Sequence, residues 1–321
     1  MARGAWRTAA YWAFIAASSA AASTVERRPL RPPRLRIRVP PVAPLTPPRE
    51  RPTPPLPAAS RIVEDIGDPA SSLRAAQDGN TRRLAELQDV GYLLERVRDR
   101  NGCSLTHRAA GSGKLETLAW LLTRTGCRAD HASDGGKKGA RGRTPLHFAA
   151  RHGHVACCRL LHERGALIDA ETASGVTPLM WAGYYGSTNA AAWLLDAGAD
   201  PLYKNAKTGC SVAHWCAAGG DVRTAQRLLE LGVPRSSFAE PNAVGHTPLN
   251  KAAAKGEVAM VDFLLDQIVP PANLLLRDQT GRSAADAASV AGFPHLAAHL
   301  RSFEDRALDA ALAQYGVPPP P

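Results

Sequence analysis

A repeated unit constrains this chain more than any other feature of its sequence. Six stretches of 26 residues, with starts 33 to 40 residues apart, align without a gap and begin at Asn101, Arg141, Ser174, Thr208, Val244 and Thr280. The second position is always Gly, the thirteenth is always Gly and the twenty-first is always Leu. A degenerate seventh unit starts upstream at Gly67. Repetition at this period predicts that one small structural unit is stacked many times.

Each recurring position has a local physical reason. The first Gly permits the positive φ of a tight turn. Thr144-Pro145, Thr177-Pro178 and Thr247-Pro248 place a hydroxyl at a helix N-cap and proline in the first turn of the helix. The second Gly ends that helix, and the Leu anchors a second helix. Such a helix pair cannot bury its apolar face alone, so we expect a solenoid in which each pair packs on its neighbours.

The motif GRTPLHFAARHGHVACCRLLHERGA, with TPLMWA and GHTPLN as near variants, resembles the ankyrin repeat. The resemblance implies an all-α solenoid of helix-turn-helix repeats with β-turn fingers, in about five full repeats plus degenerate caps. Sequences such as GCSVAHWCAAGG also look loosely like ankyrin proteins of plants and algae. We expect a repeat domain over 61–305 and a C-terminal tail over 306–321. Its units are predicted near 67–92, 101–126, 141–166, 174–199, 208–233, 244–269 and 280–301.

The basic charge of the chain is concentrated before the repeats. The formal net charge is +10, and residues 1–60 hold ten Arg against two Glu. We interpret 1–60 as a targeting peptide followed by an Arg- and Pro-rich disordered linker. Residues 1–24 lack acidic residues and favour an organelle, either plastid or mitochondrion, with a cytoplasmic or secretory location as the alternatives. No apolar run is long enough for a transmembrane helix.

The sequence gives no reason to expect an enzyme, a cofactor or a metal site. Gly111-Ser112-Gly113-Lys114 is similar to the last residues of a phosphate-binding loop motif. The turn that ends the first helix of a repeat accounts for the same residues. His154, Cys158 and His162 are spaced to share one helix face, which makes a metal site conceivable. We favour a structural role, with Cys157 and Cys158 as small apolar residues. The resemblance also implies that His107, His147 and His214 bond the backbone of neighbouring loops.

A binding surface is predicted from the columns that ankyrin proteins use for their partners, the turn tips and the late part of each first helix. One column there carries aromatic side chains flanked by cations, a composition that interface hot spots favour. Trp181 and Trp215 could instead fill gaps between repeats. The candidate residues are Arg143, Arg151, His152, Trp181, Tyr184, Tyr185, Trp215, Lys251 and Lys255. A longer, basic turn over 131–143 adds Lys137, Lys138 and Arg141, and we expect it to grip an acidic partner segment.

We therefore predict a monomeric, non-catalytic module that binds another protein on the concave face of an ankyrin solenoid, as an adaptor, scaffold or chaperone. The alternative is that the Arg/Pro tail binds an acidic surface, a membrane or a nucleic acid while the solenoid tethers cargo. No small-molecule substrate is expected. The repeats disfavour a nucleic-acid partner, because residues 61–321 hold 29 basic and 27 acidic residues.

Overall fold

The computed structural model describes residues 69–135, 141–268 and 270–314. The chain divides into two units, and the repeats lie in the one that spans Asp65–Asp309. Residues 1–60, for which we expect a targeting peptide and linker, and Lys137 and Lys138 lie outside the described residues. The described residues contain helices and one isolated antiparallel bridge, between Lys204 and Ser211, but no strand.

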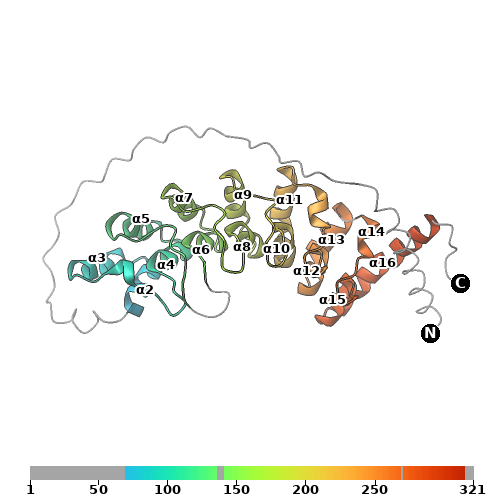
Figure 1. Cartoon of the computed structure of the whole chain (residues 1–321), viewed down its shortest axis with the longest axis horizontal. Coiled ribbons are helices and arrows are strands. Elements are labelled where there is room, and N and C mark those ends of the chain that lie inside the picture. Colours follow the sequence, from blue (N-terminus) through green and yellow to red (C-terminus); the bar gives the residue numbers. More distant parts are fainter. Residues whose placement is uncertain (1–68, 136–140, 269, 315–321) are drawn as a thin grey trace. The chain divides into compact units, whose positions relative to one another are not determined.

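The repeat domain is a stack of seven helix pairs (Figure 1). The first helices form one row, called the inner row here, in which each helix contacts the next. They are α2 (Pro69–Asp78), α4 (Leu105–Gly111), α6 (Pro145–Arg151), α8 (Pro178–Tyr184), α10 (Val212–Gly219), α12 (Pro248–Lys255) and α15 (Ala284–Val290).

The second helices form the outer row. They are α3 (Thr81–Asp89), α5 (Leu115–Arg124), α7 (Val155–Glu163), α9 (Thr188–Asp196), α11 (Val222–Glu230), α13 (Val258–Gln267) and α16 (Pro294–Gln314). Short helical turns lie between pairs: η2 (Leu94–Arg96), η3 (Arg235–Phe238) and α14 (Pro271–Leu274). The all-α ankyrin-type solenoid expected from the sequence is therefore the fold observed.

The recurring residues do what their chemistry predicts. Thr144, Thr177 and Thr247 are the N-caps of α6, α8 and α12, with proline in the first turn of each helix. Both Gly columns adopt positive φ, from 67° to 88°. The Leu column is buried at the centre of the stack, with exposures of 0 % to 1 % at Leu121, Leu161, Leu194, Leu228, Leu264 and Leu300.

Buried histidines join consecutive repeats. The Nδ1 atom of His147 accepts the backbone N–H of Thr144, which closes a capping box, and its Nε2 lies 2.9 Å from the carbonyl oxygen of Val176 in the next repeat. His107 and His214 make the same two contacts. Their Nδ1 atoms accept the N–H groups of Ser104 and Ser211, and their Nε2 atoms lie beside the carbonyl oxygens of Arg143 and His246. The structural role that the resemblance implied for this column is therefore present in the structure.

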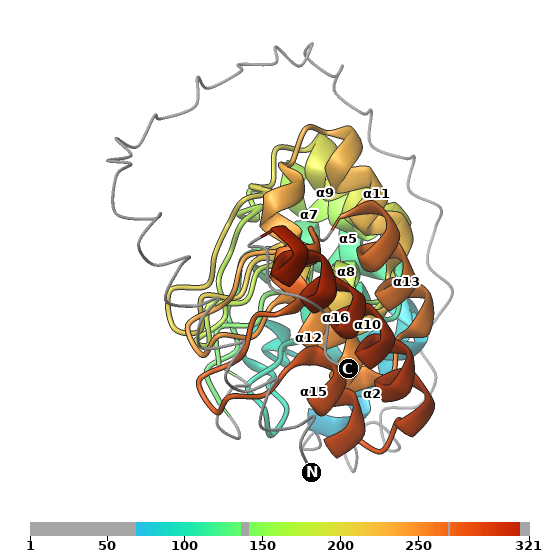
Figure 2. The same ribbon diagram turned by 90° about the vertical axis from the view of Figure 1, so that its right-hand side faces the viewer.

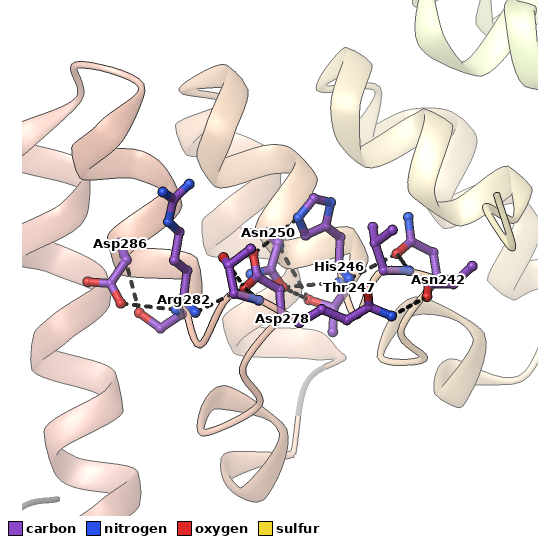
Figure 3. Close-up of polar contacts among 12 residues, drawn as sticks. Asn242, His246, Thr247, Asn250, Asp278, Arg282 and Asp286 are labelled. Atoms are coloured by element: carbon purple, nitrogen blue, oxygen red, sulfur yellow. Dashed lines mark hydrogen bonds and ion pairs between the residues drawn. The ribbon is translucent and has the colours of Figure 1, made fainter.

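The loops between helix pairs project to one side of the stack (Figure 2). Four of them are closed by a polar side chain three residues before the first Gly, as Figure 3 shows for two neighbouring loops. Oδ1 of Asn242 accepts the N–H groups of Val244 and His246, and Oδ1 of Asp278 accepts those of Thr280 and Arg282. Nε2 of His246 lies 3.2 Å from Oδ2 of Asp278, which links the two loops.

The last helix differs from the sequence expectation. We expected the last unit to end near 301, the domain at 305 and a tail to follow, whereas α16 continues to Gln314. One reason lies at Glu304, which is 9 % exposed. Its carboxylate accepts the N–H of Ala285 at 3.2 Å and lies 3.7 Å from a guanidinium nitrogen of Arg277. These contacts hold the helix against the start of α15 past residue 301, where the last unit was expected to end.

Candidate protein-binding surface

Charge is distributed unevenly between the two rows of helices. The five consecutive inner helices α4, α6, α8, α10 and α12 contain four cations and no Asp or Glu. The cations are Arg108, Arg151, Lys251 and Lys255. Each outer helix from α5 to α13 contains at least one acidic residue. Over these five repeats the inner helices therefore carry basic side chains and no acidic ones.

Aromatic rings run across the same face from one repeat to the next. Phe148 contacts Trp181 edge-on, at 5.8 Å between ring centroids. Trp181 in turn meets Tyr185 at 6.3 Å, and Tyr184 meets Trp215 at 5.7 Å. The two tyrosines are themselves in edge contact at 5.0 Å, so the series is continuous from α6 to α10. Edge-to-face pairs of this kind stabilise the packing by more than the area that they bury would give alone.

Two arginines lie over these rings. The guanidinium carbon of Arg151 is 4.3 Å from the ring centroid of Tyr185 and 5.9 Å from that of Trp181. The guanidinium carbon of Arg143 is 5.3 Å from the Trp181 centroid. Stacking fixes a guanidinium group in one orientation and leaves its edge N–H groups available to a planar anion. We call Arg151, Trp181, Tyr184, Tyr185, Trp215, Lys251 and Lys255 the basic–aromatic face.

The aromatic side chains of this face differ in their exposure to solvent. Trp181 is only 8 % exposed and Trp215 is partly buried, so both contribute to packing between repeats. Tyr185 is 45 % exposed, and Tyr184 is partly exposed beside it. The tyrosines therefore offer contact area, while Trp181 holds the position of Arg151 above it.

The remaining candidates lie at the edges of this face. His152 and Lys255 are exposed at the ends of α6 and α12, and Lys251 is partly exposed within α12. Arg141 is exposed and Arg143 partly exposed where the longer basic turn rejoins the stack. The base of that turn is closed by backbone hydrogen bonds between Ser133 and residues 142 and 143. The candidate binding residues are thus spread along the stack, over α6, α8, α10 and α12.

The two cysteines of α7 are buried in the core, whereas His162 is exposed and His154 is partly exposed. Cys157 and Cys158 are 1 % and 0 % exposed, and burial raises the pKa of Cys158 to about 12. Nδ1 of His162 lies 3.2 Å from the carbonyl oxygen of Ala166, and His154 is the N-cap of the helix. Over the parts of the chain that the structure describes, no three His, Cys, Asp or Glu side chains gather in a way that could hold a metal ion.

The loop-closing residues were missed from the sequence. Asp99 accepts the N–H groups of Asn101 and Cys103, and its second oxygen pairs with Arg108 at 2.6 Å. Arg108 is thereby paired, whereas Arg151, Lys251 and Lys255 have no ion pair with any of the residues that the structure describes. The signal was present: Asp99, Thr172, Asn242 and Asp278 each stand three residues before the first Gly, just outside the aligned 26 positions.

Together the fold and the surface define a repeat solenoid whose inner row of helices is rich in basic and aromatic side chains. Residues 106–205 match a family model described as ankyrin repeats (3 copies), and residues 213–265 match one described as ankyrin repeats (many copies). The chain therefore contains ankyrin repeats. The ankyrin repeat domain of human ASB11 has a related fold, with a TM-score of 0.56 and 23% identity, over 71% of this chain and 96% of that one.

Relatives of known sequence are longer proteins. Palmitoyltransferase ZDHHC13 of Mus musculus is 30% identical over 225 residues, which cover 60% of this chain and 34% of the relative. The Homo sapiens protein of the same name is 27% identical over 255 residues, covering 67% of this chain and 38% of the relative. The nuclear factor NF-kappa-B p105 subunit of Mus musculus is 36% identical over 135 residues, covering 41% of this chain and 13% of the relative. The chain spans about a third of the length of the palmitoyltransferases that it matches.

Ankyrin repeats are modules of protein–protein interaction, so this chain carries a protein-interaction module. Of the helices in the part of the chain that the structure covers, none is both long enough and apolar enough to cross a membrane.

Proposed function

We propose that the chain acts as an adaptor or scaffold that binds a partner protein on its basic–aromatic face, and that the repeat domain itself carries out no chemistry. The observation that carries this proposal is Arg151. Its guanidinium group is stacked on the half-exposed ring of Tyr185, and no carboxylate lies within ion-pair distance of it among the described residues. A preoriented cation beside an accessible aromatic ring is the composition of an interface hot spot.

The relatives bear on this proposal only in part. Two of them are named palmitoyltransferases, but this chain matches about a third of their length, over its ankyrin repeats. The similarity supports a domain that binds a protein and gives no support for transfer of an acyl group by this chain. The buried histidines that could otherwise suggest catalysis have structural partners, as the capping contact between His147 and Thr144 illustrates.

The proposal is tested by affinity capture with the full chain. Arg151→Ala combined with Tyr185→Ala should abolish retention of the partner from a cell extract, as read by mass spectrometry. The matched control is Arg159→Ala with Leu231→Ala, because both side chains are exposed and belong to the outer row. Circular dichroism melts establish that both double variants are folded.

The two other outcomes are equally informative. Retention of the same proteins by both double variants would show that the basic–aromatic face is not the binding site. If capture instead requires residues 1–60 and is unchanged by substitutions on the face, the Arg/Pro tail is the binding element and the alternative interpretation replaces this one.

A further inference from the structure

The uncompensated cations of the inner row indicate the chemistry of the partner. Of the four cations on α4 to α12, Arg108 is neutralised by Asp99. Arg151, Lys251 and Lys255 have no carboxylate within ion-pair distance among the described residues. Surface cations in folded proteins are usually interspersed with acids, and the outer row of this stack shows that arrangement. The inner row departs from it over five consecutive helices.

Arg151 is held for a planar anion. Its guanidinium carbon lies 4.3 Å from the centroid of Tyr185, and its Nε atom is buried without an acceptor in the described structure. A stacked guanidinium presents its N–H groups in a plane that matches the two oxygens of a carboxylate. The ordering of the arginine side chain, which normally opposes such a contact, is already provided by the two rings beneath it.

We propose that the partner binds through an extended acidic segment, with one carboxylate on Arg151, a second acidic group at Lys251 and Lys255, and an apolar side chain between them. This rests on the proposed function, because it assumes that the basic–aromatic face is the site. The apolar side chain meets Tyr184 and Tyr185 beside α10, where Trp215, Ala218 and Gly219 are partly exposed. Gly219 allows α10 to lie against α8, since a Cβ there would come 2.1 Å from the carbonyl oxygen of Tyr184.

The spacing of the acidic groups follows from the stack. Three steps separate α6 from α12, and packed helices lie about 8–10 Å apart, which gives a span of roughly 24–30 Å. An extended chain advances about 3.3 Å per residue, so roughly seven to nine residues separate the two acidic positions of the segment. A segment with its acids in one short run cannot reach both ends of the face.

Two other possible occupants of the basic–aromatic face are disfavoured. The chain's own residues 1–60 carry ten Arg against two Glu, so they are repelled by a basic face. A nucleic acid needs many phosphate contacts for affinity at physiological salt. Here three unpaired cations are divided by α8 and α10, which carry no charged side chain, and the repeats as a whole are nearly neutral.

The experiment measures binding of synthetic probes to the full chain by fluorescence anisotropy. The first probe is a labelled peptide of about 14 residues, in which two Asp-Glu pairs are separated by about eight residues that include Leu and Phe. A second peptide has the same composition with the four acids in one run, and a third has Lys in place of every acid. A labelled oligothymidine of similar length tests the nucleic-acid class.

We expect the spaced acidic peptide to bind at least tenfold more tightly than the other two peptides and the oligonucleotide, with affinity falling as salt is raised. Arg151→Gln with Lys255→Gln should weaken it at least tenfold. Arg159→Gln with Arg223→Gln removes the same charge from exposed outer-row positions and should change it less than twofold.

Several results would overturn the inference. Equal weakening by both double variants would mean unspecific attraction, and equal binding of the two acidic peptides would remove the predicted spacing. Tighter binding of the oligonucleotide would assign the face to nucleic acid. If no peptide binds while Arg151→Ala with Tyr185→Ala still abolishes protein capture, the acidic-segment inference fails and the proposed function stands. If capture is also unaffected, both fail.

Discussion

At the scale of single residues, the histidine column couples stability to pH. In His214, Nδ1 accepts the N–H of Ser211 and Nε2 lies 3.0 Å from the carbonyl oxygen of His246. The ring is therefore neutral, with its proton on Nε2. A second proton on Nδ1 would face the Ser211 N–H and break the cap. Burial lowers the pKa of His214 to about 4, against the opposing effect of its backbone hydrogen bond. The same cause lowers the pKa of His147 to about 4 and that of His107 to about 3.

The sign of the pH effect follows from these values. In the unfolded chain histidine binds a proton below about pH 6.5, whereas the folded chain resists protonation down to about pH 4. The stabilisation is therefore present above pH 6.5 and is lost as the pH falls toward 4. For each unit by which the pH falls in this window, each buried histidine should lower the free energy of unfolding by about 1.4 kcal/mol.

A substitution isolates this contribution. In α12 the same column holds Asn250, whose Oδ1 accepts the Thr247 N–H at 3.0 Å, so His214→Asn can keep the cap. It loses the contact to His246, which should cost about 1 kcal/mol at pH 8. Below pH 6.5 the variant should lose stability less steeply than the parent, by about 1.4 kcal/mol per pH unit, and the two curves should cross between about pH 5 and 6. Urea unfolding at several pH values measures this, with His295→Asn at an exposed position as the control. Parallel curves for His214→Asn and the parent would contradict the assignment.

At the scale of elements, the sequence predicts what is local and repeated. The N-cap threonines, the two Gly columns and the Leu column locate the helix pairs because each acts within a few residues of its own position. The length of α16 and the closing contact of Glu304 with Ala285 could not be predicted in this way. The contact joins residues 19 positions apart, and no other repeat has an acidic residue at the position of Glu304. The candidate surface divides similarly. Arg151, Tyr184 and Tyr185 follow from their columns, but the stacking of Arg151 on Tyr185 depends on how adjacent repeats pack.

The closing contact of α16 gives a prediction at this scale. Glu304→Ala leaves the N–H of Ala285 without its acceptor in the first turn of α15 and removes one of the two carboxylates that lie beside Arg277, the other being Asp286. We expect a loss of about 1–3 kcal/mol in the stability of the last repeat. Hydrogen exchange of α15 and of α16 up to residue 309 should accelerate more than exchange of α6 or α8. Asp309→Ala is the control, because Asp309 is exposed on the same helix. Equal acceleration across all repeats, or none at α15, would contradict this role for Glu304.

At the scale of the whole repeat stack, stability depends on neighbours. Among the described elements, the main contacts of each helix pair are with the pairs before and after it, so an interior pair is stabilised across two interfaces and a terminal pair across one. Leu194 in α9 and Leu300 in α16 occupy the same column and are almost equally buried, at 0 % and 1 % exposed. Side-chain burial alone therefore predicts equal costs of truncation, whereas the stacked arrangement predicts unequal ones.

Leu194→Ala should cost about 2–5 kcal/mol, because the cavity loosens α9 against both α7 and α11. Leu300→Ala should cost less, since only the last pair is released and the interior pairs keep their own interfaces. Urea melts of the two variants, followed by circular dichroism, measure the difference. Leu228→Ala, which lies in the interior at 0 % exposed, is the matched control and should behave like Leu194→Ala. Equal losses for the interior and terminal leucines would mean that the repeats unfold as one indivisible core. In that case the basic–aromatic face would share its stability with every repeat, including those that a partner never touches.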